Sequence, residues 1–270
     1  MTPRVLIIAG SDSGGGAGIQ ADIKTVTMLG GHAMTAITAI TAQNTLGVEA
    51  ILALPAKLVV QQAAAVVEDI GVDAIKIGMI GNADIAAALV RELRSGLYPP
   101  SIVLDPVMVA TSGARLADER TIASLHDLAR MSAIVTPNLP ELAVLCGRDA
   151  IELADIESEA ADYAARIGAA VLVKGGHGEG DLIVDRLVSP NGEVRRWTHA
   201  RIATTSTHGT GCTLASGIAA GLGHGRSLED AIDRAIAFVR AALANAPGFG
   251  SGYGPMGHAL GVIPFDEIKG

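Results

Sequence analysis

Short apolar runs alternate along this chain with segments of helical spacing, and this alternation constrains the fold more than any other feature. The runs are rich in β-branched residues and close on small or polar ones: Val5–Ala9, Ala74–Ile77, Ile102–Leu104, Ala133–Val135 and Val171–Val173. Continuous apolar runs of this length are typical of strands buried on both faces. Between them, apolar residues recur at helical spacing in Leu58–Val67, Ile85–Leu93, Ile122–Leu128 and Ile156–Ile167. The alternation predicts βαβ units and an α/β fold with a mainly parallel sheet.

One stretch departs from this rhythm. Leu182–Val188 and Val194–Thr198 both have strand patterns, and the Asn191-Gly192 pair between them favours a tight turn. This predicts an antiparallel hairpin near a sheet edge. A last helix is expected after Ser227, whose hydroxyl can cap it. Because no linker, charge block or internal repeat divides the chain, we expect one domain over residues 1–270.

Charge and cysteine content exclude several classes of protein. The 20 Lys and Arg residues against 28 Asp and Glu give a net charge of −8, which leaves no basic excess for binding a nucleic-acid backbone. Cys146 and Cys212 form no CxxC pattern, so neither a disulfide framework nor a structural zinc site is expected, and the compartment is predicted to be reducing and cytoplasmic. The apolar run Val5–Ala9 is too short for a signal peptide, and no uncharged stretch has the character of a membrane span.

Two familiar nucleotide-binding patterns are absent, and another glycine-rich segment takes their place. The sequence has no GxGxxG and no Gly-Lys dipeptide, which disfavours dinucleotide Rossmann enzymes and P-loop proteins. The segment Thr207–Thr213 precedes a small-residue helical run, Leu214–Leu222, so its backbone amides can form an anion hole for a phosphoryl group. Cys212 in that position is predicted to have a lowered pKa and to accept a proton from a substrate hydroxyl. A glycine-rich helix start with an inert cysteine fits the same residues.

A second glycine-rich loop lies within Ala9–Asp22, directly after the first strand. Ligands of open α/β sheets bind at the carboxyl ends of strands, so this loop is a candidate binding site. Gln43 ends another apolar segment, and its amide can pair with the edge of an aminopyrimidine. Alternatively, Gln43 is an ordinary polar residue at the end of a strand.

Polar residues follow three further strands. Asp105 and the pair Asn138 and Glu141 could hold Mg²⁺ through water molecules, although on spacing alone Asn138 and Glu141 fit the cap of the next helix. Lys174 lies at a strand end beside glycines and is a candidate phosphate contact, with a solvent-facing lysine as the alternative.

Together these segments resemble the ribokinase-like superfamily, and within it the hydroxymethylpyrimidine/phosphomethylpyrimidine kinases of thiamine biosynthesis. The resemblance spans nearly the whole chain, in order, through Ala9–Asp22, Thr41–Thr45, Lys76–Met79, Leu104–Met108, Thr136–Glu141, Val173–His177 and Thr207–Leu214. It implies a three-layer αβα fold and ATP-dependent phosphorylation of 4-amino-5-hydroxymethyl-2-methylpyrimidine and then of its monophosphate. It also implies Mg²⁺ as cofactor and a homodimer, with no nucleic-acid or membrane partner.

The resemblance assigns a role to each candidate residue. The anion hole is formed by Gly209, Thr210, Gly211 and Cys212, with Cys212 as the catalytic base in place of the aspartate usual in the superfamily. The pyrimidine is held by Gln43, Asp22, Gly10, Met79 and Val107. The nucleotide is bound by Lys174, Asn138, Thr207 and His208, and the metal by Asp105 and Glu141.

Two other functions remain open from the sequence. A pyridoxal kinase is the nearest, since pyridoxal also carries a hydroxymethyl group on a flat ring, and Gln43 favours the aminopyrimidine over it. A non-catalytic pyrimidine-binding sensor is the other, and the presence of Cys212, Lys174 and Glu141 argues against it.

Overall fold

The computed structural model describes residues 1–96, 98–99, 101–108, 118–177 and 180–259. Its elements in chain order are β1 (Arg4–Asp12), α1 (Gly18–Met28), β2 (His32–Gln43), β3 (Val48–Ala53), α2 (Ala56–Asp69), β4 (Ala74–Ile77), α3 (Ala83–Leu93), β5 (Ile102–Leu104), α4 (Glu119–Ala129), β6 (Ile134–Val135), α5 (Leu139–Cys146), α6 (Ile156–Ile167), β7 (Ala170–Val173), the 3₁₀ turn η1 (Gly175–His177), β8 (Leu182–Val188), β9 (Val194–Ala200), α7 (Thr210–Gly223) and α8 (Leu228–Ala244).

The strands of the described residues form one sheet in the order β3-β2-β1-β4-β5-β6-β7-β8-β9. The pairs from β2 to β7 are parallel, and β8 and β9 add the antiparallel hairpin at one edge. The mainly parallel sheet and the edge hairpin are thus confirmed. The opposite edge carries a second antiparallel strand, β3, which the sequence pattern did not predict.

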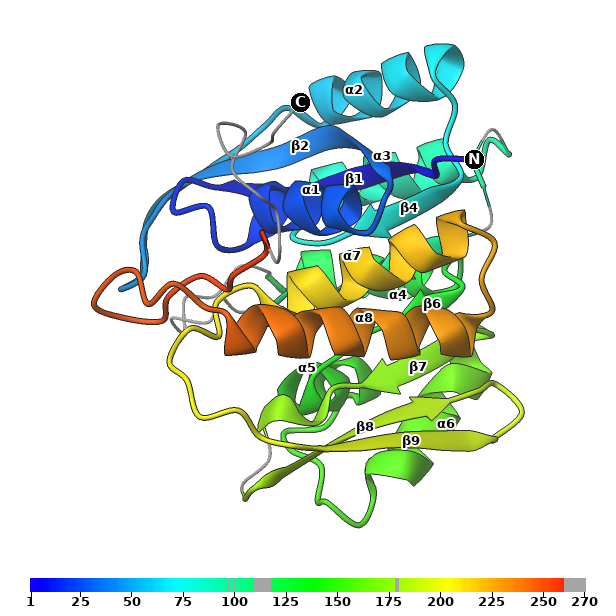
Figure 1. The fold of residues 1–270 in the computed structure, drawn as a ribbon. Coiled ribbons are helices and arrows are strands. Elements are labelled where there is room, and N and C mark those ends of the chain that lie inside the picture. Colours follow the sequence, from blue (N-terminus) through cyan, green and yellow to red (C-terminus); the bar gives the residue numbers. More distant parts are fainter. Residues whose placement is uncertain (97, 100, 109–117, 178–179, 260–270) are drawn as a thin grey trace.

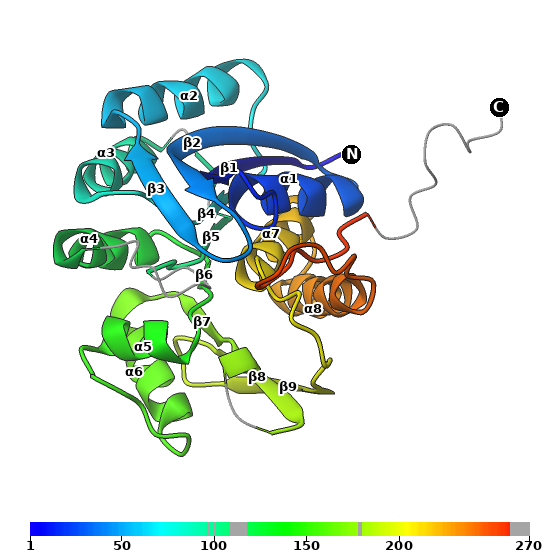
Figure 2. The ribbon, with the colours of Figure 1, turned by 90° about the vertical axis from the view of Figure 1, so that its left-hand side faces the viewer.

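Helices cover both faces of the sheet and give it three layers (Figure 2). Because successive side chains of a strand point to opposite faces, Leu6 and Ile8 of β1 join the core beneath α2 to α6, whereas Val5 and Ile7 join the core beneath α1, α7 and α8. The buried runs of the central strands therefore serve two cores at once, which is why they are almost entirely apolar; Lys76 of β4 is the exception among the described residues.

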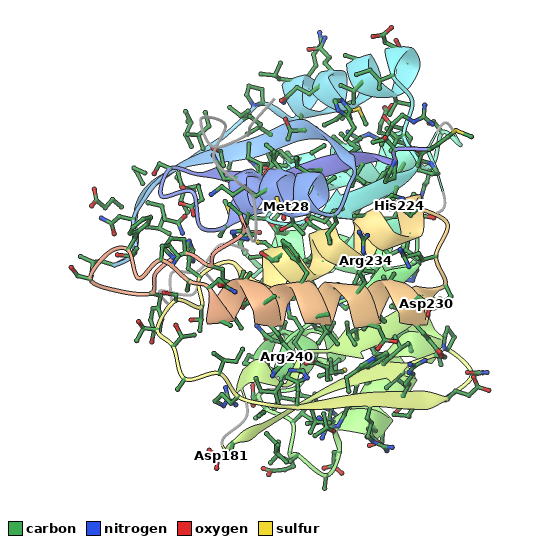
Figure 3. All side chains as sticks on the ribbon, viewed as in Figure 1. Met28, Asp181, His224, Asp230, Arg234 and Arg240 are labelled. Carbon is green, nitrogen blue, oxygen red and sulfur yellow. The ribbon has the colours of Figure 1, made fainter. Side chains whose placement is uncertain are left out.

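Small residues allow α7 and α8 to pack closely in the second layer (Figure 1). A Cβ atom added at Gly217 or Gly221 would lie within 2.8 Å of Ala235 or Ala231 of α8. In the same layer, His224 and Arg234 both bind the carbonyl oxygen of Leu29, after α1 (Figure 3). These contacts fix α7, and with it the start of that helix, against the sheet.

The parallel strands end at a common edge, where the β1–α1 loop and the first turn of α7 also lie (the left side of Figure 1). Ligands of open α/β sheets bind at this edge. Within the described ranges, no helix has the length and apolar character needed to cross a membrane.

Candidate active site

The start of α7 packs directly against the glycine-rich loop that follows β1. Gly209 is the N-cap of α7, with a φ of 83°, and a Cβ atom there would lie 2.0 Å from the carbonyl oxygen of Gly16. Only glycine meets both demands. No side chain caps this helix end, so the amides of Gly211 and Cys212 in its first turn remain available to an anion, whereas the Thr210 amide donates to the carbonyl oxygen of Thr207. The structure thus brings together two segments that are almost 200 residues apart.

A lysine and two carboxylates adjoin this helix start. Lys174 Nζ lies 2.8 Å from Asp105 Oδ1 and 3.5 Å from Glu141 Oε2. Burial lowers the pKa of Lys174, but the two carboxylates outweigh burial and raise the pKa above its usual range. A Cβ atom at Gly211 would lie 3.1 Å from Lys174 Nζ and 3.6 Å from Asp105 Oδ2. A permanently charged ammonium therefore lies beside the candidate anion hole.

Asn138 and Glu141 form the capping box of α5. Asn138 Oδ1 accepts a hydrogen bond from the Glu141 amide, and Glu141 Oε2 accepts one from the Asn138 amide, both at 2.8 Å. The capping interpretation of these two residues is confirmed. Glu141 has a second neighbour in Lys174, and burial raises its pKa despite that lysine.

Three polar side chains meet at the other side of the α7 start. His208 Nε2 lies 2.9 Å from Asp12 Oδ2 and 3.2 Å from Gln43 Nε2. Asp12 also accepts hydrogen bonds from the amides of Gly14, Gly16 and Ala17, and so shapes the glycine-rich loop. Burial raises the pKa of Asp12, but the hydrogen bonds from His208 and the amides outweigh it and lower the pKa.

This arrangement brings together residues that the sequence assigns to different ligands and adds a third residue. His208, predicted to bind the nucleotide, lies beside Gln43, predicted to bind the pyrimidine. The nucleotide role of His208 stays a prediction. Asp12 was missed. The available signal was its position, directly after a buried strand and before a run of glycines whose amides need an acceptor.

Three neighbouring strands end in residues expected to hold the pyrimidine ring. Gly10 lies near the end of β1, Met79 follows β4 and Val107 follows β5. A Cβ atom at Gly10 would lie 3.2 Å from the sulfur of Met79, so Gly10 and Met79 are side by side. Thr38 donates a hydrogen bond to the Met79 carbonyl oxygen at 2.6 Å and holds that segment in place.

Asp22 and Lys76 form a buried ion pair beneath the start of α7. Lys76 Nζ lies 2.8 Å from Asp22 Oδ2, and Ser216 of α7 donates a hydrogen bond to Asp22 Oδ1 at 2.7 Å. Neither side chain of the pair is exposed. The expectation that Asp22 holds polar groups of the substrate stays a prediction; in the structure both of its carboxylate oxygens already accept hydrogen bonds, one from Lys76 and one from Ser216. Lys76 lies inside a strand and is not among the site residues predicted from the sequence.

The predicted lowering of the Cys212 pKa is also wrong. Burial raises the pKa of this thiol to about 11; Lys76 acts in the opposite direction, and Asp22 and Asp105 add to the rise. The helix start alone does not determine the ionisation of Cys212, because burial, and after it the nearby carboxylates, oppose its effect on the thiol.

The segment after α8 closes over these loops. The His208 amide donates to the Gly254 carbonyl oxygen at 3.2 Å, and the Tyr253 amide donates to that of Thr45 at 2.9 Å. His258 Nε2 lies 2.8 Å from the hydroxyl of Thr213, the residue after Cys212. Residues 253–258 therefore brace both the start of α7 and the turn after β2 (red in Figure 1).

Comparisons with known proteins find relatives that match nearly the whole chain. Residues 12–257 match the family model of phosphomethylpyrimidine kinase. A hydroxymethylpyrimidine/phosphomethylpyrimidine kinase of Rhizobium meliloti is 46% identical over 96% of this chain and 97% of its own length. A thiamine biosynthesis multifunctional protein of Corynebacterium efficiens is 43% identical over 95% of this chain, which spans about a third (35%) of that longer relative.

Solved structures give the same fold. The ADP complex of Bacillus subtilis pyridoxal kinase superposes with a TM-score of 0.87 at 31% identity, covering 96% of this chain and 98% of the other. A phosphomethylpyrimidine kinase from Clostridium difficile 630 superposes with a TM-score of 0.77 at 36% identity, covering 88% of this chain and 98% of the other. The expected ribokinase-like architecture is confirmed.

Proposed function

This chain belongs to the phosphomethylpyrimidine kinase family, and on that premise we propose that it transfers the γ-phosphoryl group of ATP to 4-amino-5-hydroxymethyl-2-methylpyrimidine and then to the monophosphate. The observation that carries this proposal is the closeness of Lys174 and Asp105 to Gly211, the residue before Cys212: a Cβ atom added there would lie 3.1 Å from Lys174 Nζ and 3.6 Å from Asp105 Oδ2. It combines available helix amides, a fixed positive charge and a proton acceptor within one small volume, as phosphoryl transfer requires.

In the proposed reaction the hydroxymethyl oxygen of the pyrimidine attacks the γ-phosphorus of ATP in line. The new O–P bond forms as the bond to the β-bridging oxygen breaks, and ADP leaves. The thiolate of Cys212 accepts the proton of the attacking hydroxyl. The amides of Gly209 to Cys212 and the ammonium of Lys174 stabilise the charge that spreads over the transferred oxygens. In the second reaction the attacking oxygen belongs to the monophosphate.

We infer that the divalent metal that such kinases use would be held here through water molecules. Among the described residues, no three His, Cys, Asp or Glu side chains are grouped to bind a metal ion directly. Asp105 and Glu141 nevertheless converge on one cation, the Lys174 ammonium, and Mg²⁺ keeps most of its hydration shell in phosphate sites. We therefore assign Asp105 and Glu141 to the water shell of Mg²⁺, which when bound neutralises charge on the ATP phosphates. Asn138 and Thr207 are assigned to the nucleotide side with Lys174.

Gln43, Gly10, Met79 and Val107 are assigned to the pyrimidine. The Oε1 atom of Gln43 accepts a hydrogen bond from Thr41 at 3.1 Å, which fixes the amide plane. His208 approaches the other end of this amide. A fixed amide at the pocket edge suits the exocyclic amine and adjacent ring nitrogen of an aminopyrimidine.

We also assign the exposed edge of β3 to a homodimer contact. Leu52 of β3 is 64% exposed and pairs across the ladder with Ile40 of β2, which is 48% exposed. Ile51 on the opposite face of β3 is also exposed. An exposed edge strand with apolar residues on both faces promotes aggregation unless another chain covers it.

The test is ATP turnover with Mg²⁺ on the pyrimidine alcohol, its monophosphate and pyridoxal in parallel, for the wild type, Cys212→Ala and Cys146→Ala. Cys146 is the matched control, because it is the other free and half-buried cysteine. We expect turnover of both pyrimidines and a loss of at least about 100-fold in Cys212→Ala alone. Preference for pyridoxal would assign the chain to pyridoxal kinase activity, and binding without turnover would make it a sensor.

A further inference from the structure

The amine of Lys76 ends close to the reaction site although its side chain is completely buried. A Cβ atom at Gly78 would lie 2.6 Å from Lys76 Nζ, so the amine reaches along β4 to the residue before Met79. Its ionic partner Asp22 lies 2.8 Å away on α1. The pair thus lies under the point where β1, β4 and α7 meet.

Cys212 lies above this pair on α7. Cys212 and Ser216 are four residues apart and therefore share one helix face. Ser216 donates to Asp22 Oδ1, which shows that this face is turned toward the ion pair. Cys212 lies one turn nearer the helix start on the same face. The positive charge of Lys76 stabilises a negative charge on the thiol, and the thiolate in turn favours the charged lysine.

The charges around Cys212 come from three elements. Lys76 of β4 favours the thiolate, whereas Asp22 of α1 and Asp105 after β5 disfavour it. Asp105 is partly neutralised by Lys174 at 2.8 Å. Among these groups, Lys76 has the largest influence on the thiol, followed by Asp22.

A buried ion pair gives little stability that apolar residues of the same size would not give, because both charges lose their hydration. The pair beneath Cys212 therefore calls for a role other than packing. Ser216 fixes Asp22, Asp22 fixes Lys76, and the resulting ammonium is held where the charge on sulfur develops.

We propose that Lys76 is a positioning residue for the phosphoryl transfer. Its ammonium, fixed by the buried Lys76–Asp22–Ser216 network, favours the proton-accepting thiolate of Cys212 against the effect of burial and of the neighbouring carboxylates. This inference rests on the proposed function for the identity of the reaction. The thiol first loses its proton to water, the thiolate takes the proton of the attacking hydroxyl as the O–P bond forms, and the thiol returns that proton to water after release. Lys76 keeps its own proton throughout.

The experiment measures the pH dependence of Cys212 alkylation by iodoacetamide, without ATP or pyrimidine, in a Cys146→Ala background. Lys76 and Asp22 carry opposite charges. Removing the charge of one or of the other should therefore shift the apparent pKa of Cys212 in opposite directions. Lys76→Met should raise the apparent pKa of Cys212 by a unit or more, and so slow alkylation about tenfold at a fixed pH below it. Asp22→Asn should lower that pKa, and Lys76→Arg should stay near the wild type.

Several variants keep the proposal open to refutation. Lys57→Met removes an exposed lysine on α2 and should leave alkylation unchanged. If Lys76→Met fails to fold, two variants still show in which direction each charge shifts the pKa of Cys212: Asp22→Asn and the double variant Lys76→Met/Asp22→Asn. Shifts in the same direction for both single variants, or no shift in either, would overturn the proposal.

A kinetic readout separates this inference from the proposed function. The acidic limb of the kcat profile should move with the alkylation pKa in each variant. If the alkylation shifts appear but neither pyrimidine is turned over, the proposed function fails while the coupling between Lys76 and Cys212 stands. If turnover is normal and the pH profile of kcat is the same in the Lys76 variants as in the wild type, this inference is refuted while the proposed function stands.

Discussion

His208 Nε2 lies 2.9 Å from Asp12 Oδ2, across 196 residues of sequence. This contact joins the loop after the first strand to the residue before the Gly209 turn, and Gln43 reaches the same imidazole. The residues assigned to the pyrimidine and those assigned to the phosphate are therefore linked by direct contacts. We expect a substitution in either glycine-rich segment to affect the binding of both groups.

Gly209→Ala should abolish turnover, because its methyl group would meet the Gly16 carbonyl oxygen at 2.0 Å and displace the start of α7. Gly225→Ala is the matched control. It has a similar φ of 76° but nothing within 4 Å of the added carbon. The control should lose roughly 1 kcal/mol of stability and keep its kcat, whereas Gly209→Ala should lose at least about 100-fold in kcat. Equal kcat in both variants would contradict the assignment of the anion hole.

Asp12→Asn should lower stability at neutral pH. The pKa of Asp12 is lowered in the folded protein, so its carboxylate stabilises the fold above its ordinary pKa, and this contribution is lost as the pH falls through the folded value. The free energy of unfolding should fall by about 1–3 kcal/mol at pH 7, and the difference should vanish in strong acid. Urea unfolding across pH 3 to 8 measures it. Asp149→Asn, at an exposed aspartate, is the control.

The free energy of unfolding should fall in acid because His258 is buried in its neutral form. Burial lowers the pKa of this imidazole to about 4, below its unfolded value, so the unfolded chain binds more protons as the pH falls from 6.5 toward 4. Between pH 7 and 5 the wild type should lose about 2 kcal/mol from this residue. His258→Gln should remove that loss while keeping a partner for Thr213, and the exposed His32→Gln should not. If the free energy of unfolding of His258→Gln depends on pH as that of the wild type does, His258 is not the source of the acid sensitivity.

Gln43→Leu should weaken recognition of the aminopyrimidine more than that of pyridoxal. The leucine keeps the approximate shape but removes the donor and acceptor, leaving the ring amine and nitrogen unpaired. We expect kcat/KM to fall by roughly 100-fold for the pyrimidine and by less than about tenfold for pyridoxal, measured as ATP turnover. Equal losses on both substrates would mean that Gln43 supports the loop and does not read the ring.

Leu52→Lys should disrupt the homodimer. A charge on this face of β3 would have to be buried in the contact, which an ion without a partner resists. Light scattering should give the mass of two chains for the wild type and of one for the variant, with Leu153→Lys, another exposed leucine far along the chain, as the control. A monomeric wild type would refute the assigned contact.

The local pattern of the sequence predicted most of the secondary structure. Apolar runs found the buried central strands, and the turn residues Asn191 and Gly192 found the β8–β9 hairpin. The strand β3 was missed because its residues are largely exposed, and it therefore lacks the alternation that burial imposes. The capping of α5 by Asn138 could be predicted from spacing, since a cap and its box lie within one turn.

Which candidate residues belong together was decided by the tertiary structure. The sequence by itself determined the strands, the glycine positions and the chemical groups, because those depend on neighbours along the chain. It could not show that Lys76 pairs with Asp22, that Asp22 also binds Ser216 of α7, or that His208 contacts Gln43. Ionisation and orientation depend on charges and packing from distant segments. The helix start alone predicted a lowered pKa for Cys212, whereas burial in the folded protein, helped by Asp22 and Asp105, raises it.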